Sequence, residues 1–429
     1  MRRHRKVKAS RAVILARVGP TVPGGTGHTR VGGCALQVTR SEVGPRRSAA
    51  GEAKVVRSFW LLAAVNAFVG SMVGLERTIV PILAEQDFGL RAGASIGSFI
   101  IAFAIAKAVF NLFAGAAADR WGRRRVLIIG WLVSLPVAPL LAWAPTWEVV
   151  VFANLLLGVG QALTWSMTLN MMVDLVPVRR RGFAAGINEF AGYLGVSVVA
   201  FMTGLVAAEF GLRPWPFLMG VAFALTGLTL SLRAPETSPA AKPAPLRWIP
   251  GVGVPSLLGL ATNLKDGLVW LSLPLMLTAR GFDLAQVGLV AGLYPLMWAV
   301  GQPLFGPLSD RIGRRPLIVA GMALQGAGLL VLAAASSYAT ALLAAVLLGL
   351  GTGMVYPVLI AAVADRAAAE KRATALGVYR FFRDSGYALG ALIGSLGLLD
   401  LAGATTWTGA AFAPLAVVAS VGLARRSTA

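Results

Sequence analysis

The chain has 429 residues, of which 57% are hydrophobic and only 13% are charged, and its mean hydropathy is +0.73. Soluble domains carry about 25% charged residues, so this composition excludes a soluble globular protein. Only α-helices and closed barrels can span lipid, because every backbone polar group must be hydrogen-bonded internally. The apolar stretches are long and continuous rather than alternating, which favours an all-α membrane protein over a barrel.

The first 57 residues form a basic stretch with 13 Lys and Arg and two acids. It has no sustained apolar period, so we predict a disordered tail at 1–57, and the sequence leaves open whether a start codon placed too far upstream added it. The net charge of +21 could indicate a nucleic-acid partner, but Lys and Arg also gather in cytoplasmic loops, so we expect none. Cys34 and both histidines lie in this tail, and we therefore expect no metal site in the membrane and no cofactor.

Twelve apolar segments follow, several of them near the ~20 residues that cross a bilayer. We predict spans at 58–83, 92–117, 126–144, 147–172, 183–207, 214–232, 250–279, 284–308, 317–335, 339–363, 374–399 and 404–424. They divide into a six-helix bundle at 58–233, a Pro/Ala-rich linker at 234–249, a second six-helix bundle at 250–424 and a short tail at 425–429.

The charges of the connecting loops indicate an orientation. The loops after even-numbered spans and the C-terminal tail hold 18 Lys and Arg, whereas the opposite loops hold three. Positive charge stays on the cytoplasmic side of a membrane. We therefore predict a multi-pass protein of the cell inner (plasma) membrane with both termini in the cytoplasm.

An internal repeat relates the two bundles. A shift of 191 residues superposes Gly115 on Gly306, Asp119 on Asp310 and, further along, Asp174 on Asp365. One register holding over about 80 residues indicates two pseudo-symmetric halves. Transporters built in this way bind their substrate between the halves, near the membrane midplane.

Two loops share one motif, G-A-A-A-D-R-W-G-R-R-R at 115–125 and G-P-L-S-D-R-I-G-R-R at 306–315. The motif resembles the signature loop of the major facilitator superfamily, G-x-x-x-D-R-x-G-R-R, and the resemblance covers 58 to about 424. It implies 12 transmembrane helices in two bundles that rock to give alternating access, with Asp119 meeting helix 11 in the outward-open state. It also implies the ion pairs Arg123–Asp174 and Arg314–Asp365. The residues that it assigns to the gate are Gly115, Asp119, Arg120, Gly122, Arg123, Asp174, Gly306, Asp310, Arg311, Gly313, Arg314 and Asp365.

Other motifs of the superfamily are missing. Drug/proton antiporters carry an Arg in helix 4, where this chain has Asn154, and a Gly-Pro motif in helix 5, where it has no Pro. Drug or metabolite efflux by antiport therefore remains an alternative subtype that the motifs do not support.

Ionisable side chains within the spans are candidates for a substrate and proton cavity, since a charge at the bilayer centre costs about 2.5–3.5 kcal/mol on insertion scales. The nine are four acids and five bases, a balance that slightly favours an anionic or zwitterionic substrate; the alternative is that some form structural ion pairs. With three polar or aromatic neighbours, the candidates are Glu76, Arg77, Lys107, Glu189, Lys265, Asp266, Arg380, Arg383, Asp384, Asn66, Trp165 and Asn263.

Three expectations concern these charges. Glu76 and Asp266 are the first candidates for a proton carrier, because the membrane part holds no histidine. Their sequence neighbours Arg77 and Lys265 point about 100° away on a helix, so we do not expect them to pair with these acids. Lys107 and Asp384 lie at similar depth on helices that face each other across the halves in members of the superfamily. Asp384 could be claimed by Lys107, in an ion pair that forms in one state, or by Arg380 one turn away; the alternative for Lys107 is that it snorkels within its own half.

The sequence therefore predicts a secondary active transporter of a small organic solute that works by alternating access and is proton-coupled. Its expected partners are the small-molecule substrate, a proton or other coupling ion and the lipid bilayer, and we expect a monomer. An enzyme is not expected, since the chain has no intramembrane His or Cys and no Gly-x-Ser-x-Gly elbow. The alternative of a different class is a transporter-like membrane sensor without transport.

Overall fold

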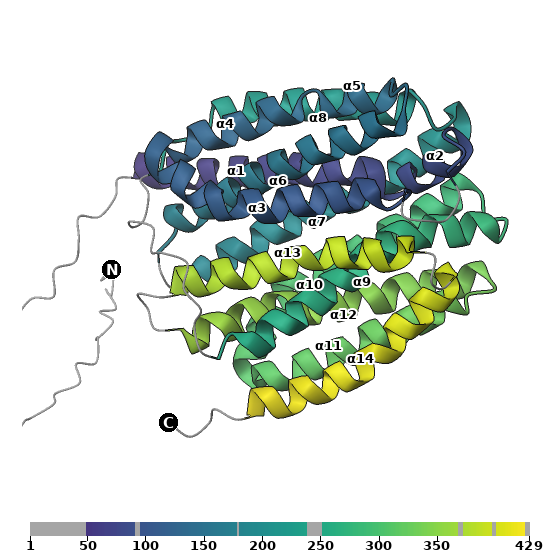
Figure 1. Ribbon diagram of the computed structural model, residues 1–429. Helices are drawn as coiled ribbons and strands as arrows, with labels where there is room; N and C mark the ends of the chain where they lie inside the picture. Colours follow the sequence, from purple (N-terminus) through teal and green to yellow (C-terminus); the bar gives the residue numbers. More distant parts are fainter. Residues whose placement is uncertain are drawn as a thin grey trace, which may run out of the picture. The chain divides into compact units, whose positions relative to one another are not determined.

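The computed structural model describes residues 49–90, 95–177, 180–237, 251–367, 372–396 and 400–424. Within these ranges the chain forms fourteen helices and no strand (Figure 1). The first eight helices are α1 (Ala49–Arg77), α2 (Val80–Gln86), α3 (Ser98–Trp121), α4 (Arg123–Ser134), α5 (Val137–Ala142), α6 (Trp147–Leu175), α7 (Arg181–Phe210) and α8 (Trp215–Leu232). The other six are α9 (Gly253–Ala279), α10 (Leu284–Ile312), α11 (Arg314–Ala333), α12 (Tyr338–Arg366), α13 (Arg372–Ser395) and α14 (Leu401–Ala424).

The fourteen helices of the described ranges correspond to the twelve predicted spans, because two of the spans are each broken into two helices. A turn at Thr78 and Ile79 separates α1 from α2, and Leu135 and Pro136 separate α4 from α5, where the proline has no N–H to continue the helix. By length and composition, ten spans in the described residues could cross a membrane. The remaining two are α9 and α13, which are 27 and 24 residues long and carry several of the predicted cavity charges.

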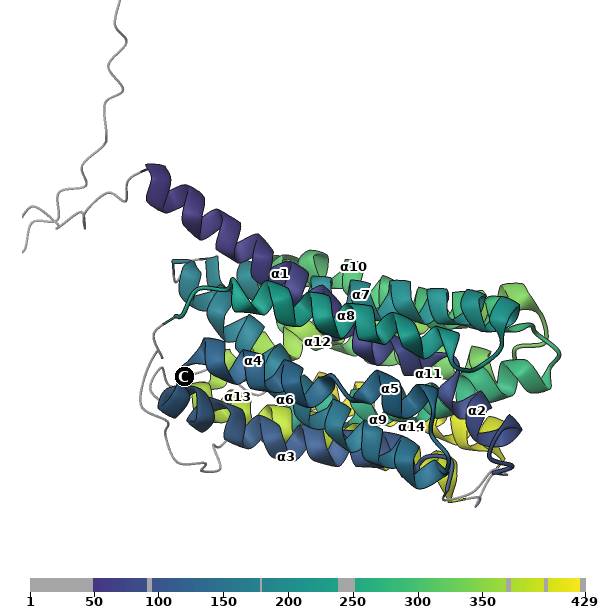
Figure 2. The ribbon, with the colours of Figure 1, turned by 90° about the horizontal axis from the view of Figure 1, so that it is seen from above.

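The fold class predicted from the sequence is confirmed, and helix boundaries differ at the start. Helix α1 begins at Ala49 rather than at Ser58, so the last residues of the predicted tail are helical. The remainder of that tail, residues 1–48, lies outside the described residues. So do residues 238–250, which include most of the linker predicted at 234–249. In Figure 1 the helices of the first half (purple to teal) lie above those of the second half (green to yellow), and Figure 2 shows them running alongside one another.

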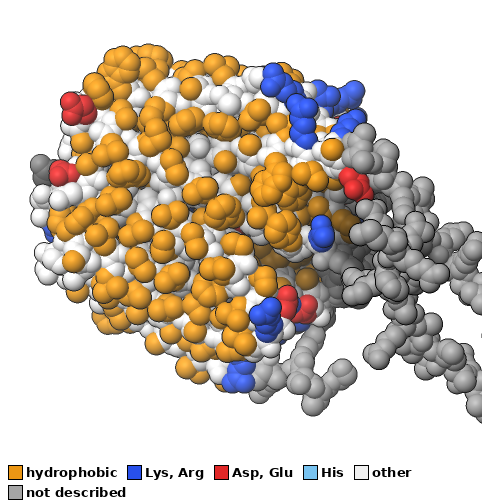
Figure 3. Space-filling view, turned by 180° about the vertical axis from the view of Figure 1, so that it is seen from behind, with side chains coloured by type: hydrophobic (Ala, Val, Ile, Leu, Met, Phe, Trp, Pro, Cys, Tyr) orange, Lys and Arg blue, Asp and Glu red, His pale blue; other side chains and the backbone are white. Residues whose placement is uncertain are grey.

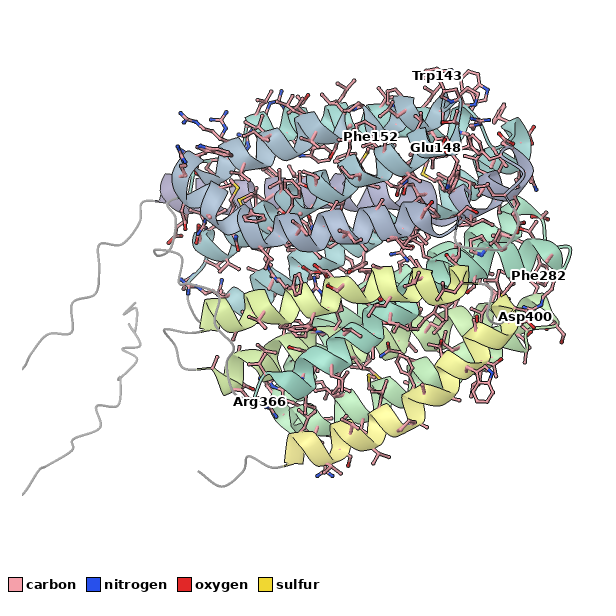
Figure 4. The ribbon with its side chains drawn as sticks, in the orientation of Figure 1. Trp143, Glu148, Phe152, Phe282, Arg366 and Asp400 are labelled. Atoms are coloured by element: carbon pink, nitrogen blue, oxygen red, sulfur yellow. The ribbon has the colours of Figure 1, made fainter. Side chains whose placement is uncertain are left out.

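The surface suits lipid along the helices and water at their ends. Figure 3 shows hydrophobic side chains over most of one face, with Lys and Arg gathered at one end. That end carries the two loops at 119–123 and 310–314, and we call it the signature end. We call the opposite end the distal end; in Figure 4, Arg366 lies at the signature end, and Phe282 and Asp400 lie at the distal end.

The two halves meet mainly through two helix pairs, α3 with α13 and α7 with α10, and α2 makes a smaller contact with α9. At the distal end both pairs are in close contact: a Cβ built on Gly97, just before α3, would lie 1.8 Å from Ser395 Oγ of α13, and one on Gly204 would lie 2.6 Å from the Cα of Gly288. The glycines thus allow backbones to approach where any side chain would collide.

The same helices have room at the signature end. A Cβ built there would meet nothing within 4 Å at any of four glycines, one on each helix: Gly115, Gly186, Gly306 and Gly377. The halves are therefore in contact at the distal end, and the four interface helices leave space around their signature-end glycines.

Candidate functional site

Each signature loop turns on a glycine with a positive φ. Gly122 has a φ of 88° and Gly313 a φ of 92°, values that side-chain-bearing residues rarely adopt. The turns join α3 to α4 and α10 to α11, so the arginine after each glycine begins a new helix. This accounts for the second glycine of the repeated motif.

Both ion pairs implied by the superfamily resemblance are formed. Arg123 contacts Asp174 at the end of α6, and its Nη1 also donates to the carbonyl oxygen of Asn170 at 3.1 Å. In the second loop, Arg314 lies 3.1 Å from Asp365 and 2.6 Å from Asp310. The side chains of Asp119, Arg120 and Arg311 are exposed in this conformation. The gating role of these residues remains a prediction.

The first loop has a partner that the sequence reading missed. Glu236, just beyond α8, accepts hydrogen bonds from the backbone N–H groups of Arg123 at 2.8 Å and Arg124 at 3.3 Å. A carboxylate at a helix N-terminus satisfies unpaired N–H groups and interacts favourably with the helix dipole. The sequence placed Glu236 only in the Pro/Ala-rich linker. The available signal was an acid that closely follows a helix, in a half that also carries a basic loop.

A small cavity lies between the halves. Its lining comes from α1, α3, α6, α7 and α13, and it has room for about one water molecule. Three of the predicted cavity residues, Arg77, Lys107 and Trp165, line it. The full lining is Val73, Arg77, Phe103, Lys107, Trp165, Tyr193, Val196 and Tyr387.

The two cations of the cavity lie against aromatic rings. The Arg77 guanidinium is 4.4 Å from the centre of the Trp270 ring of α9, and Lys107 Nζ is 5.3 Å from the ring centres of Phe103 and of Trp165. Neither side chain forms an ion pair or a hydrogen bond with any residue that the structure describes. Ring contacts of this kind attract a cation without neutralising it.

Two cations of the second half, Lys265 and Arg383, have acidic partners instead. Lys265 Nζ of α9 donates to Tyr294 Oη at 2.5 Å and to Thr352 Oγ1 at 2.6 Å, and lies 2.7 Å from Asp266 Oδ1. Tyr294 in turn donates to Asp266. All three ammonium hydrogens thus have an acceptor, which a fully buried charge requires. Tyr294 and Thr352 are further residues that the sequence reading missed.

The expectation that sequence neighbours do not pair is wrong in this half. Lys265 contacts Asp266, and Arg383 Nη2 lies 2.6 Å from Asp384 Oδ1. The 100° angle describes where side chains leave the helix, but the long side chains of Lys and Arg can bend back far enough to reach a neighbouring carboxylate. The first half does follow the expectation, since Glu76 and Arg77 form no ion pair in the described part of the chain.

Asp384 is occupied by groups other than Lys107. It accepts from Arg383 Nε at 2.7 Å and from Asn111 Nδ2 at 2.8 Å, while Asn263 is 3.5 Å away. Asn111 lies one turn beyond Lys107 on α3, so this amide rather than the ammonium joins the halves. The Lys107–Asp384 pair is not formed in this conformation and stays a prediction for another one.

The remaining predicted residues lie near the cavity without lining it. Glu189 accepts from Trp165 Nε1 at 2.9 Å, and Asn66 Nδ2 donates to the carbonyl of Asn188 at 2.6 Å, which ties α1 to α7. Glu76 is fully buried, and neither of its carboxyl oxygens accepts a hydrogen bond from the described residues. Arg380 is half-buried.

Two halves of membrane-spanning helices, joined along α3 with α13 and α7 with α10, are the architecture of a multi-pass membrane transporter. The profile of the Major Facilitator Superfamily matches residues 59–260 and 256–428, and the chain belongs to this family.

Relatives of the chain include other transporters. An uncharacterized transporter of the same superfamily from Salmonella typhimurium is 28% identical over 339 residues, covering 73% of this chain and 83% of the relative. A probable nitrate/nitrite transporter of Mycobacterium tuberculosis is 29% identical over 346 residues, covering 76% and 84%. A probable sulfoacetate transporter of Cupriavidus necator is 26% identical over 278 residues, covering 58% and 63%. The crystal structure of the nucleoside transporter NupG shares the fold, with a TM-score of 0.65 and 14% identity over 86% of this chain and 100% of the other.

Proposed function

We propose that this protein is a secondary active transporter that moves a small organic solute by alternating access, with a proton as the coupling ion. The observation that carries the proposal is the pattern of small residues on the four helices that join the halves. Each helix has one such residue in contact at the distal end and one facing open space at the signature end.

On each of the four helices, the distal-end residue and the signature-end residue lie on the same face. The pairs are Gly97 with Gly115, Gly204 with Gly186, Gly288 with Gly306, and Ser395 with Gly377, and the members of each are 18 residues apart. Eighteen residues are five turns at 3.6 residues per turn, so both members point the same way. A rocking motion that separates the distal contacts would bring the signature-end glycines into equivalent contacts, α3 with α13 and α7 with α10.

Proton coupling is assigned to a buried carboxyl group. Asp266 already has Lys265 and Tyr294 as partners, whereas Glu76 has no hydrogen bond from the described residues, so Glu76 is the better candidate in this conformation. The loop charges support an orientation in the inner membrane with the signature end and both termini in the cytoplasm. We propose that the protein works as a monomer. Two relatives are named for nitrate/nitrite and for sulfoacetate, which favours an anionic solute over a zwitterionic one.

Disulfide trapping tests alternating access. In a Cys34→Ser background, one variant carries Gly97→Cys with Ser395→Cys, and the other carries Gly115→Cys with Gly377→Cys. The first pair should cross-link in this conformation, since a Cβ at position 97 lies 3.2 Å from that of Ser395, and a small separation of the two helices gives the distance of about 3.5–4.5 Å that a disulfide needs. The second pair should cross-link only in the opposite state, and either bond should stop transport.

The matched measurement is solute uptake into proteoliposomes with and without a proton gradient. Efflux by antiport would appear as export of the solute in exchange for protons that enter down their gradient. A protein that never forms the second cross-link and transports nothing would be a sensor-like membrane protein, and the proposal would fail.

A further inference from the structure

We propose that the cavity between the halves binds a small anion, with the carboxylate, sulfonate or nitrate-like group of the solute held between Arg77 and Lys107. The inference rests on the proposed function, because it names the solute class of the same cavity. Its starting point is the set of charges around the cavity and the partners that each one has.

Two of the acids near the cavity, Asp384 and Glu189, already have donors. Asp384 accepts from Arg383 and Asn111, and Glu189 accepts from the indole of Trp165. Glu76 is adjacent to Arg77 in the chain but forms no ion pair with it. Arg77 and Lys107 are thus left, within the described residues, as two cations that line one cavity without a bonded acid.

Leaving such cations unpaired is costly. A buried charge loses its hydration, and the loss is offset only when another charge or strong hydrogen bonds replace the water. Lys265 in the second half has such replacements from three groups: Tyr294, Thr352 and Asp266. An anion that enters the cavity would supply to Arg77 and Lys107 what Asp266 supplies to Lys265.

The aromatic contacts prepare the two cations for this role. Trp270 supports one face of the Arg77 guanidinium, and Phe103 and Trp165 flank the Lys107 ammonium. A stacked guanidinium keeps its N–H groups in one plane, in which they can donate to two oxygens of a planar or tetrahedral anion. Trp270 belongs to the second half, so the group that binds the anion also contacts the half that must move.

The cavity must widen to admit a solute. It has room for about one water molecule in this conformation, so a solute enters only as the signature end opens further. The ring of Tyr387 and the side chains of Val73 and Val196 complete the lining, which leaves apolar surface beside the two cations. The lining therefore suits an anion whose charged group lies at the two cations and whose apolar part lies beside them.

Binding can be measured without transport. Full-length protein in detergent is titrated with nitrate, sulfoacetate and acetate as sodium salts, and with acetamide and choline as neutral and cationic controls, against sodium chloride at equal ionic strength. Tryptophan fluorescence and the melting temperature report binding, since Trp165 and Trp270 contact the two cations. At least one anion should bind saturably, and acetamide and choline should not.

Four variants locate the site. Arg77→Gln and Lys107→Gln should each weaken anion binding by about tenfold or more, because a charge-assisted hydrogen bond is lost. Arg77→Lys and Lys107→Arg keep the charge and should retain part of the affinity. The matched control is Arg315→Gln, which removes one exposed charge that hydrogen-bonds Ser420 outside the cavity and should leave binding unchanged.

The outcomes separate this inference from the proposed function. Folded wild-type protein that binds none of the anions, or Gln variants that bind them as the wild type does, would overturn the anion site. Uptake of a neutral or cationic solute would also overturn it while upholding transport. Anion binding that depends on Arg77 and Lys107, without uptake in proteoliposomes, would uphold the site and overturn the transport proposal.

Discussion

The two halves of the molecule share their architecture and differ in how they treat buried charge. In the second half, Lys265 and Arg383 each contact an acid that is their neighbour in sequence. In the first half, Arg77 and Lys107 lie on aromatic rings and contact no acid in the described ranges. Because the halves are repeats with the same signature loops, the difference does not come from the fold. It indicates that Arg77 and Lys107 need a ligand to supply what an acid of the chain supplies to Lys265 and Arg383.

The largest effect is expected when the Lys265–Asp266 ion pair of the second half is broken. Asp266→Asn leaves Lys265 buried without its acid, and we expect a loss of about 3–5 kcal/mol of stability, measured by thermal or denaturant unfolding in detergent. The control is the double variant Lys265→Gln with Asp266→Asn, in which no buried charge remains and much of the stability should return. An equal loss in the single and double variants would show that packing, not the ion pair, is responsible.

A second, smaller contrast lies in the signature loops. The side chains of Arg123 and Asp174 are only 8% and 15% exposed, whereas those of Arg314 and Asp365 are 24% and 56% exposed. Exposed ion pairs contribute about 0–1 kcal/mol, and more buried ones cost more to break. Asp174→Asn should therefore lower the stability by about 1–3 kcal/mol and Asp365→Asn by less than about 1 kcal/mol. The same unfolding measurement compares them, and equal losses would contradict the contrast.

The smallest effect is expected in the first half. Without ligand, Lys107→Gln removes a half-buried charge that has no acidic partner, so the stability should stay the same or rise by less than about 1 kcal/mol. Transport should nevertheless be lost. A loss of stability as large as that of Asp266→Asn would mean that Lys107 has a structural partner after all, and the two halves would then be alike.

The repeat in the sequence was enough to predict the fold and the loops. The resemblance of the duplicated Gly-Asp-Gly motif to the superfamily's signature loop implied both ion pairs of the signature loops, and the apolar lengths led to the twelve spans. Contacts that depend on side-chain length were not predictable from helical angles, as Lys265 with Asp266 shows. Tyr294 and Thr352 were missed because an aromatic and a hydroxyl residue in an apolar helix give no signal until packing brings them to Lys265.

The position of Glu236 has a consequence for taking the protein apart. Its carboxylate holds the first turn of α4 although it lies past α8, on the segment that leads to the second half. The two bundles can be produced as separate polypeptides only if the cut respects this contact. A division after Thr237 keeps the first fragment complete, whereas a division directly after Leu232 would deprive its signature loop of a capping group and place that group on the wrong fragment.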